Sequence, residues 1–290
     1  MLQVVTRSFT ILAAAALCSC SNIDIKGLFV PTGDSVDSRF EQSAAMNADL
    51  KYATLETEAN YTFYVAADAH VDQTHTNLTR FNDAFRNDPD VLFGVILGDC
   101  TDTRNNLPKY LEALSYTPER HTHNHRIFHL LGNHDAYFDG WKDFKDMIGP
   151  SVYWFETVFP EGKDLYISLD TATGTLGKKQ TDWFKGFIEK NRSSYRHCTI
   201  LTHTNFFYTD NSQAGSGNMP IEECFWLIDF LGRHNVSLVL QGHDHFREEL
   251  THRNVNYTVL GAIADKSESP EYLRIEVTSE GMKLDWHIIS

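Results

Sequence analysis

Six apolar runs of strand length recur along this 290-residue chain, and they limit how it can fold. They occupy residues 61–67, 91–97, 126–131, 165–169, 198–202 and 236–241. Most are apolar without interruption, which is the pattern of strands buried on both faces of a sheet. Helical periodicity appears between several of them, so the sequence predicts an α/β protein in which strands alternate with helices.

The C-terminal segment follows a different pattern. Residues 271–277 and 282–288 alternate polar and apolar side chains around the turn sequence "TSEG", which predicts an antiparallel hairpin. Together with the six runs, this hairpin predicts one domain of mixed β-sheets with helices on the outside.

Asp, Asn or His residues follow five of the six runs. Gly98, Gly132 and Gly242 each precede one of them and permit the tight turn that aims the next side chain inward. A single such residue is explained by a helix cap or a buried hydrogen bond. Five at corresponding strand ends favour a ligand site, because ligands of open α/β sheets bind outside the carboxyl ends of the strands. The residues are Asp68, His70, Asp99, Asp102, Asn133, His134, His203, His243 and His245.

The chemistry of this set predicts a catalytic metal site. Carboxylate, amide oxygen and imidazole ligands without thiolate suit Mn, Fe, Zn or Co. Seven ligands from among these nine residues are too many for one ion that keeps an open position. They suit two divalent ions about 3.5–4 Å apart that share one bridging carboxylate.

The order of the motifs closely resembles the calcineurin-like metallophosphoesterase superfamily. D-x-H, G-D-x-x-D, G-N-H-D, a later His and G-H-x-H occur in that order over roughly residues 60–250. The resemblance implies two mixed β-sheets packed as a sandwich and flanked by helices on both faces. It also implies that Asp68, His70 and His245 hold one ion and Asn133, His203 and His243 the other, with Asp99 bridging.

The resemblance places His134 beside the substrate, as a proton donor or a phosphate contact. Asp102 would accept a hydrogen bond from His134 and favour its protonated form, although a loop cap is the alternative for Asp102. Asp135 is expected to orient a ligand imidazole. We expect hydrolysis of a phosphomonoester or phosphodiester by a metal-activated hydroxide, with His134 protonating the leaving oxygen.

Departures from the family pattern argue against two branches of the superfamily. Purple acid phosphatases would have D-x-G and a tyrosine where this chain has His70 and Asp102. Ser/Thr protein phosphatases would read G-D-x-x-D-R-G and G-N-H-E, so a protein-phosphatase role is disfavoured. The loop over residues 204–220 lacks the usual continuation after His203, which leaves that rim of the site undetermined.

Two alternative functions are also compatible with the sequence. Aromatic residues after the motifs could stack a base, as in a cyclic-nucleotide or nucleotide phosphodiesterase, although aromatics are more often buried in a core. A non-catalytic metal-binding surface lipoprotein is the second alternative, but it would be expected to have lost ligands. The aromatic residues in question are Tyr137, Trp141, Phe206, Phe207 and Tyr208.

The N-terminus predicts export. Residues 1–19 combine a basic residue, a short apolar core and small residues, as in a signal peptide. Cys20 ends a sequence that resembles a bacterial lipobox, so we expect it to be lipidated; ordinary signal cleavage nearby is the alternative. Residues 20–58 predict a tether with one short helix around 36–47, and 59–290 the catalytic domain. The expected location is the periplasm or cell envelope, with membrane attachment only through the lipid anchor.

Net charge limits the partners of the chain. The formal charge is -14, and no cluster of Lys and Arg could follow a nucleic-acid backbone. We therefore expect no extended nucleic-acid surface. A small phosphorylated substrate would be attracted by the local positive charge of the metal ions.

Overall fold

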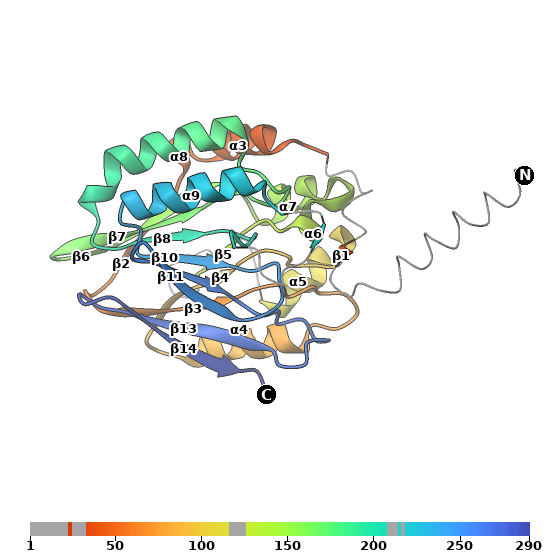
Figure 1. Cartoon of the computed structure of the whole chain (residues 1–290). Helices are drawn as coiled ribbons and strands as arrows, with labels where there is room; N and C mark the ends of the chain where they lie inside the picture. Colours follow the sequence, from red (N-terminus) through yellow and green to blue (C-terminus); the bar gives the residue numbers. More distant parts are fainter. Residues whose placement is uncertain (1–22, 25–32, 116–125, 208–213, 216–217) are drawn as a thin grey trace, which may run out of the picture.

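The computed structural model describes residues 23–24, 33–115, 126–207, 214–215 and 218–290 (Figure 1). The predicted signal peptide, Cys20 and Tyr208 lie outside the described residues. In the described part of the chain, no helix combines the length and the apolar character needed to cross a membrane.

Two mixed β-sheets form the centre of the molecule (Figure 1). The larger sheet has the order β11-β12-β10-β8-β7-β6-β2, and the smaller has the order β14-β13-β3-β4-β5. The larger comprises β2 (Lys51–Glu56), β6 (Tyr153–Phe159), β7 (Gly162–Ser168), β8 (Cys198–Leu201), β10 (Leu238–Gln241), β11 (Glu248–His252) and β12 (Val255–Val259). The smaller comprises β3 (Tyr61–Ala66), β4 (Val91–Ile96), β5 (Arg126–His129), β13 (Glu271–Val277) and β14 (Met282–Ile288). All six apolar runs therefore form strands, and the predicted C-terminal hairpin is the pair β13–β14.

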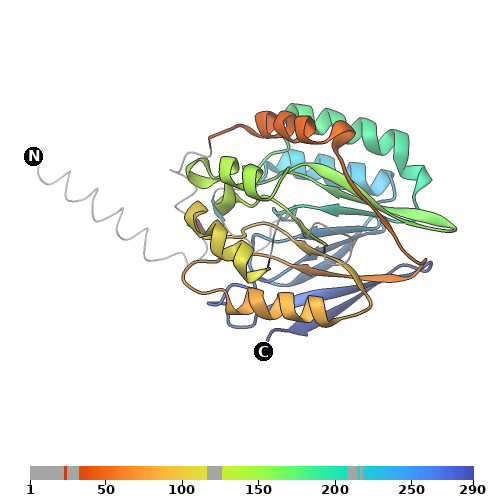
Figure 2. The same ribbon diagram turned by 180° about the vertical axis from the view of Figure 1, so that it is seen from behind.

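Helices cover both outer faces of the sandwich (Figures 1 and 2). The smaller sheet is covered by α4 (Thr76–Asn87) and α5 (Leu107–Ala113), and the larger by α8 (Gly177–Asn191) and α9 (Ile221–Arg233). The remaining helices are α3 (Val36–Met46), α6 (Asn133–Ala136) and α7 (Trp141–Met147), with 3-10 turns η1 (Ala48–Leu50), η2 (Arg104–Asn106), η4 (Tyr137–Asp139) and η5 (Arg192–Ser194). A short pairing joins β1 (Ile23–Asp24) to β9 (Ala214–Gly215). The predicted architecture, two mixed sheets between helices, is confirmed.

Strand β3 explains why the runs are apolar on both faces. Phe63 and Val65 point between the two sheets, where Phe63 stacks on Phe93 of β4 with ring centroids 4.7 Å apart. Tyr64 and Ala66 point outward and pack in the cluster that includes Phe81 of α4. Because successive side chains of a strand face opposite sides, both alternate sets must be apolar here.

The folded domain begins earlier than the sequence predicted. Residues 20–58 were expected to form a tether, yet β2 pairs in parallel with β6 inside the larger sheet. The side chain of Arg39 in α3 is fully buried, and its guanidinium binds the Asp170 carboxylate through hydrogen bonds of 2.7 and 2.9 Å. The tether prediction is therefore wrong for residues 36–56, which are part of the domain. The residue that fixes α3 to the domain, Arg39, is polar, so a hydrophobic pattern could not indicate its burial.

Candidate metal centre

The predicted site residues meet at one edge of the sandwich. Parallel pairing brings the carboxyl ends of β3, β4 and β5 together in the smaller sheet, and those of β8 and β10 in the larger. The loops after these strands carry three groups of potential ligands whose donor atoms lie within 4.8 Å of one another. The groups are Asp68, His70, Asp99 and His245; Asp99, His203 and His243; and His70, Asp102 and His134.

Left-handed backbone conformations mark these loops. Five of the site residues have positive φ although none is glycine, and such conformations cost about 1–3 kcal/mol each. Strain of this kind persists where the surrounding structure determines the conformation, and it is concentrated at functional sites. The residues are Asp68 (54°), His70 (41°), Asp99 (47°), His243 (72°) and His245 (61°).

Two glycines are required for different reasons. Gly98 has a φ of 92°, which gives the predicted turn before Asp99. Gly132 has an ordinary φ of -96°, so turn freedom is not its role. A Cβ atom on Gly132 would lie 2.1 Å from the backbone nitrogen of Asp99, which shows that the two loops touch here. Close approach of the β4 and β5 loops therefore depends on this glycine.

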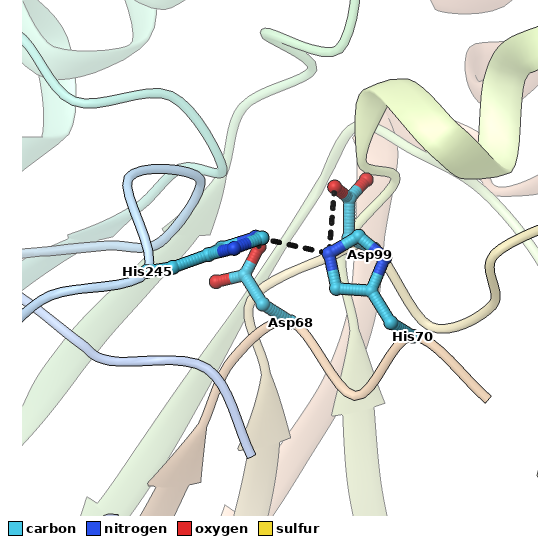
Figure 3. Close-up of side chains that lie close together, drawn as sticks. All are labelled: Asp68, His70, Asp99 and His245. Atoms are coloured by element: carbon cyan, nitrogen blue, oxygen red, sulfur yellow. Dashed lines mark hydrogen bonds and ion pairs between the residues drawn. The ribbon is translucent and has the colours of Figure 1, made fainter. Parts of the chain in front are cut away.

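The first group gathers around Asp68 (Figure 3). The imidazoles of His70 and His245 approach from opposite sides, with their Nε2 atoms 3.0 Å apart. The Nε2 atom of His70 lies 3.5 Å from Asp99 Oδ2, and that of His245 lies 3.6 Å from Asp68 Oδ1. Asp68, His70 and Asp99 are buried, whereas 32% of the His245 side chain is exposed, so this group is open to solvent on the His245 side.

The second group is wholly buried. The Nδ1 atom of His203 donates to the Leu97 carbonyl over 2.8 Å, which leaves Nε2 facing the group. That Nε2 atom is 2.8 Å from Asn133 Oδ1 and 3.4 Å from Asp99 Oδ1. The Nδ1 atom of His243 lies 3.1 Å from the same amide oxygen. Four donors from four loops thus converge, and Asp99 belongs to both groups.

The donor separations fit small divalent ions. Ligands bound at about 2.0–2.2 Å to one ion lie roughly 2.8–3.6 Å from their neighbours, from octahedral to tetrahedral geometry. The separations of 2.8–3.6 Å in the two groups match this range. The described cysteines, Cys100, Cys198 and Cys224, are buried and belong to neither group. An oxygen and nitrogen donor set of this kind suits Mn, Fe, Zn or Co.

Electrostatics keep the carboxylates ionised. Burial by itself raises the pKa of Asp99, but the charges of His203 and His134 outweigh it and hold that pKa well below its usual value. Burial disfavours the charged form of His203, yet Asp99 and Asp68 raise the pKa of its imidazole to about 10. Burial and the neighbouring His203 lower the pKa of His243 to about 4. Two ionised carboxylates and several imidazoles are thus buried together, and a divalent cation that binds them would displace the proton of His203.

Asp102 lies between two imidazoles. Its Oδ1 atom is 3.5 Å from Nδ1 of His70 and 3.7 Å from Nδ1 of His134. The His134 Nδ1 atom is also 3.4 Å from the Asp102 carbonyl oxygen. The predicted neighbourhood of His134 and Asp102 is present, and Asp102 contacts His70 as well.

Asp135 has a different role from the one expected. Its carboxylate accepts hydrogen bonds from the backbone N–H groups of Gly132, Cys100 and Thr101, at 3.0–3.2 Å. It therefore fastens the β4 loop to the β5 loop through backbone groups, and in the described part of the chain it forms no hydrogen bond to a candidate ligand imidazole. Burial and the nearby Asp99 charge raise the pKa of Asp135 to about 7.

The structure adds two polar contacts that the sequence did not reveal. Asn218 Oδ1 lies 3.1 Å from Nε2 of His243, and the Tyr137 hydroxyl accepts from Asn133 Nδ2 over 2.8 Å. The apolar pattern carries no signal for Asn218, which lies in the loop before α9. Tyr137 stands four residues after Asn133, which is the spacing of neighbours on a helical turn and could have indicated the contact.

The aromatic residues considered for base stacking are mostly buried. Tyr137, Trp141 and Phe206 have at most 4% of their surface exposed. Phe207 is half-buried and packs edge-on against Tyr257 with centroids 4.8 Å apart. Tyr137, Trp141 and Phe206 are therefore not available as a stacking platform in this conformation.

Comparison with known proteins agrees with the fold and identifies the family. The profile of the calcineurin-like phosphoesterase family matches residues 61–247, which is more than half of the chain. The sequence has no significant match among curated proteins.

Several solved structures share the fold. GAP50, the anchor in the inner membrane complex of Plasmodium, has a TM-score of 0.58 at 12% identity, over 80% of this chain and 86% of that chain. A dimetal phosphatase from Danio rerio has a TM-score of 0.54 at 14% identity, over 79% and 98%. A purple acid phosphatase from yellow lupin (Lupinus luteus) seeds has a TM-score of 0.61 at 12% identity, over 80% and 52%. At these identities the likeness concerns the fold.

Proposed function

Because the chain belongs to the calcineurin-like phosphoesterase family and is a metal-dependent phosphoesterase, we propose that it hydrolyses its substrate at a centre of two divalent ions. The observation that carries the proposal is the position of Asp99, whose carboxylate belongs to both groups of donor atoms. A carboxylate with two oxygens can bind one ion with each, as two-metal hydrolases require.

The donor groups divide the ligands between the two ions. Asp68, His70 and His245 would hold the ion on the solvent side, and Asn133, His203 and His243 would hold the buried one. When bound, the ions would supply the Lewis acidity that lowers the pKa of a water molecule and neutralises charge on the phosphoryl oxygens. The nitrogen and oxygen donors are compatible with Mn, Fe, Zn or Co.

His134 is the proposed proton donor. It is not needed as a ligand, and its side chain is 14% exposed, so a substrate can reach it. Its backbone N–H donates to Asp99 Oδ1 over 2.9 Å, which fixes the position of the residue relative to the centre. Asp102 lies beside its ring, with Oδ1 3.7 Å from Nδ1, and can orient the imidazole toward a departing oxygen.

We propose a bacterial exported enzyme that is lipidated at Cys20 and attached to the membrane of the cell envelope only by that anchor. Its substrate is a small phosphate ester, since the acidic surface offers no extended site for nucleic acid.

A metal-replacement assay tests the proposed reaction. The purified protein, stripped with a chelator, is incubated with Mn, Fe, Zn, Co or Mg and then with 4-nitrophenyl phosphate. Turnover that returns with added metal, and reaches its maximum near two equivalents, is the expected result. A maximum at one equivalent contradicts the two-ion centre. Absence of turnover with every metal favours the non-catalytic surface lipoprotein.

A further inference from the structure

Two cavities adjoin the solvent side of the metal centre. One, of about 450 Å³, is lined by His245 and continues along Gly261 and Ser267. The other, of about 340 Å³, is lined by His70 and Asp102 and continues along Gln73. We refer to them as the His245 cavity and the His70 cavity. Each has the size of a pocket for a small organic group.

The two cavities lie next to different ligands of the same proposed ion. Figure 3 shows His70 and His245 approaching Asp68 from opposite sides. Ala264 and Lys266 line both cavities, so the turn that carries them stands between the two spaces. Two hydrogen bonds from the backbone of Thr76 and Asn77 to the Asp265 carboxylate hold this turn against the start of α4.

Polar side chains form part of the lining of both cavities. Ser267, Ser269 and Arg247 line the His245 cavity, and Gln73 and Thr74 line the His70 cavity. The Arg247 guanidinium is already engaged, because it lies 2.8 Å from Glu249 and over the ring of Trp286. These hydroxyl and amide groups offer hydrogen bonds to hydroxyl groups of a substrate, and Phe246 adds an apolar part to the wall of the His245 cavity.

Lys266 is the available cation between the cavities. It is exposed, and within the described ranges it forms no ion pair or hydrogen bond. In a chain with a net charge of -14, an ammonium group without a carboxylate partner beside a metal centre is available to an anionic ligand. Its position at both cavities suits an anion that lies between two substituents.

We propose that the substrate is a phosphodiester with two hydrophilic arms, one in each cavity, and that Lys266 contacts the phosphate between them. A monoester has a single organic substituent and would leave one cavity unused, whereas a diester has one on each side of phosphorus. This inference rests on the proposed phosphoesterase function, and it selects a substrate class for that same site.

The arrangement also assigns the leaving group. Asp102 lines the His70 cavity and lies 3.7 Å from His134, so the arm in this cavity is the one whose oxygen His134 can reach. A water oxygen forms the new bond to phosphorus, and the bond from phosphorus to that arm breaks. His134 gives its proton to the departing oxygen, and the proton lost by water returns to His134 through solvent. The products are an alcohol from the His70 cavity and a monoester held in the His245 cavity.

A matched pair of substrates tests the inference. Bis(glyceryl) phosphate and glycerol 3-phosphate carry the same hydrophilic glyceryl arm. The diester has two such arms, and the monoester has one. For the metal-loaded protein we expect a kcat/KM for the diester at least about tenfold above that for the monoester, the effect of losing one set of contacts. A preference for glycerol 3-phosphate, or for 2′,3′-cyclic AMP, would overturn the inference and leave the phosphoesterase function standing.

Variants that fill the cavities extend the test. Gly261→Phe fits into the His245 cavity because a Cβ there has only the His245 carbonyl oxygen nearby, at 3.9 Å. Gln73→Trp fills the His70 cavity from an exposed position. Each should lower the ratio of diester to monoester kcat/KM by about tenfold or more. Gly186→Phe, on the exposed face of α8 with nothing within 4 Å, is the matched control and should leave the ratio unchanged.

Further outcomes separate the two proposals. If Gly261→Phe does not fold, Ser267→Trp fills the same cavity from a half-buried position. If the ratio of diester to monoester kcat/KM falls in only one of the two cavity-filling variants, a single arm is bound and the diester assignment is wrong. Turnover of 4-nitrophenyl phosphate without turnover of bis(glyceryl) phosphate also rejects it. Failure on all phosphate esters rejects the proposed function itself.

Discussion

The side-chain amide of Asn133 donates a hydrogen bond to the Tyr137 hydroxyl over 2.8 Å, and its oxygen faces His203 and His243. An amide can rotate to present either its oxygen or its nitrogen to a neighbour. The tyrosine hydroxyl satisfies the nitrogen, so the oxygen is the atom presented to the buried donor group. Tyr137 is therefore a positioning residue for a proposed metal ligand.

Tyr137→Phe should weaken metal binding without removing a ligand. Loss of an outer hydrogen-bond partner typically lowers metal affinity by about 10–100-fold. We expect the effect in a metal titration, while the unfolding free energy changes by about 1–3 kcal/mol. Tyr153→Phe is the control, since it removes a buried hydroxyl that bonds the His129 carbonyl outside the donor groups. Equal loss of metal affinity in both variants would argue against a positioning role.

Asp99→Asn should release both ions together. The change keeps the size of the side chain and removes the charge on the one carboxylate shared by the two groups. We expect metal content to fall well below one equivalent and turnover to fall by more than about 100-fold, beyond the loss of an outer partner. Elemental analysis of the purified variant measures the first quantity. Two full equivalents of metal with normal turnover would show that Asp99 does not bridge.

His134→Ala should retain both metals and lose activity selectively. General acid catalysis contributes typically about 10²–10⁴-fold, and only when the leaving oxygen is basic. Hydrolysis of an alkyl ester should therefore slow far more than hydrolysis of an activated aryl phosphate. Steady-state kinetics on the two substrate types makes the comparison. Equal losses on both would assign His134 to phosphate positioning, and loss of metal would mean that the ligand assignment is wrong.

Asp170→Asn should destabilise the whole domain through α3. It leaves the guanidinium of Arg39 buried without its carboxylate, and breaking one partner of a buried pair costs about 3–5 kcal/mol. Denaturant unfolding measures the change. Glu41→Gln is the control, because Glu41 pairs with Lys179 on the surface between α3 and α8, where pairs contribute about 0–1 kcal/mol. A change below 1 kcal/mol in Asp170→Asn would mean that α3 is not fixed to the domain by this pair.

Cys20→Ala should move the protein from the membrane fraction to the soluble fraction. The prediction rests on the lipobox-like sequence before Cys20 and on the signal peptide of residues 1–19. Detergent partitioning of cells that express each form is the measurement. Ser19→Thr, which keeps the cysteine, serves as the comparison. Unchanged membrane partitioning of Cys20→Ala would leave attachment by lipid without support.

Most of the site could be predicted because its signal is local. Each candidate ligand follows an apolar run within a few residues, and parallel strands bring their carboxyl ends to one edge. The contacts that escaped prediction are distant or polar. Arg39 and Asp170 are separated by 131 residues, and only the folded chain shows that the two bury each other. Asn218 reaches His243 from a loop without periodicity.

The strands that the sequence did not predict differ in how far their side chains are buried. Strand β11 has mostly exposed side chains, so an apolar pattern cannot mark it. Strand β2 lies at the end of the larger sheet and buries only two of its six residues, which gives a weak alternation. Strand β6 is strongly apolar and its signal was present in "YWFETVF". Edge strands are thus recognised from their pairing in the folded chain, whereas central strands can be predicted from their hydrophobic residues.

The left-handed backbone at Asp68, His70, Asp99, His243 and His245 has a thermodynamic consequence. At about 1–3 kcal/mol each, five such residues oppose folding by an amount comparable to the net stability of a typical domain. A ligand that binds only the folded form adds stability that grows with its concentration over its dissociation constant. Binding of the proposed ions is thus coupled to folding. The melting temperature of this protein should rise as the proposed centre becomes occupied.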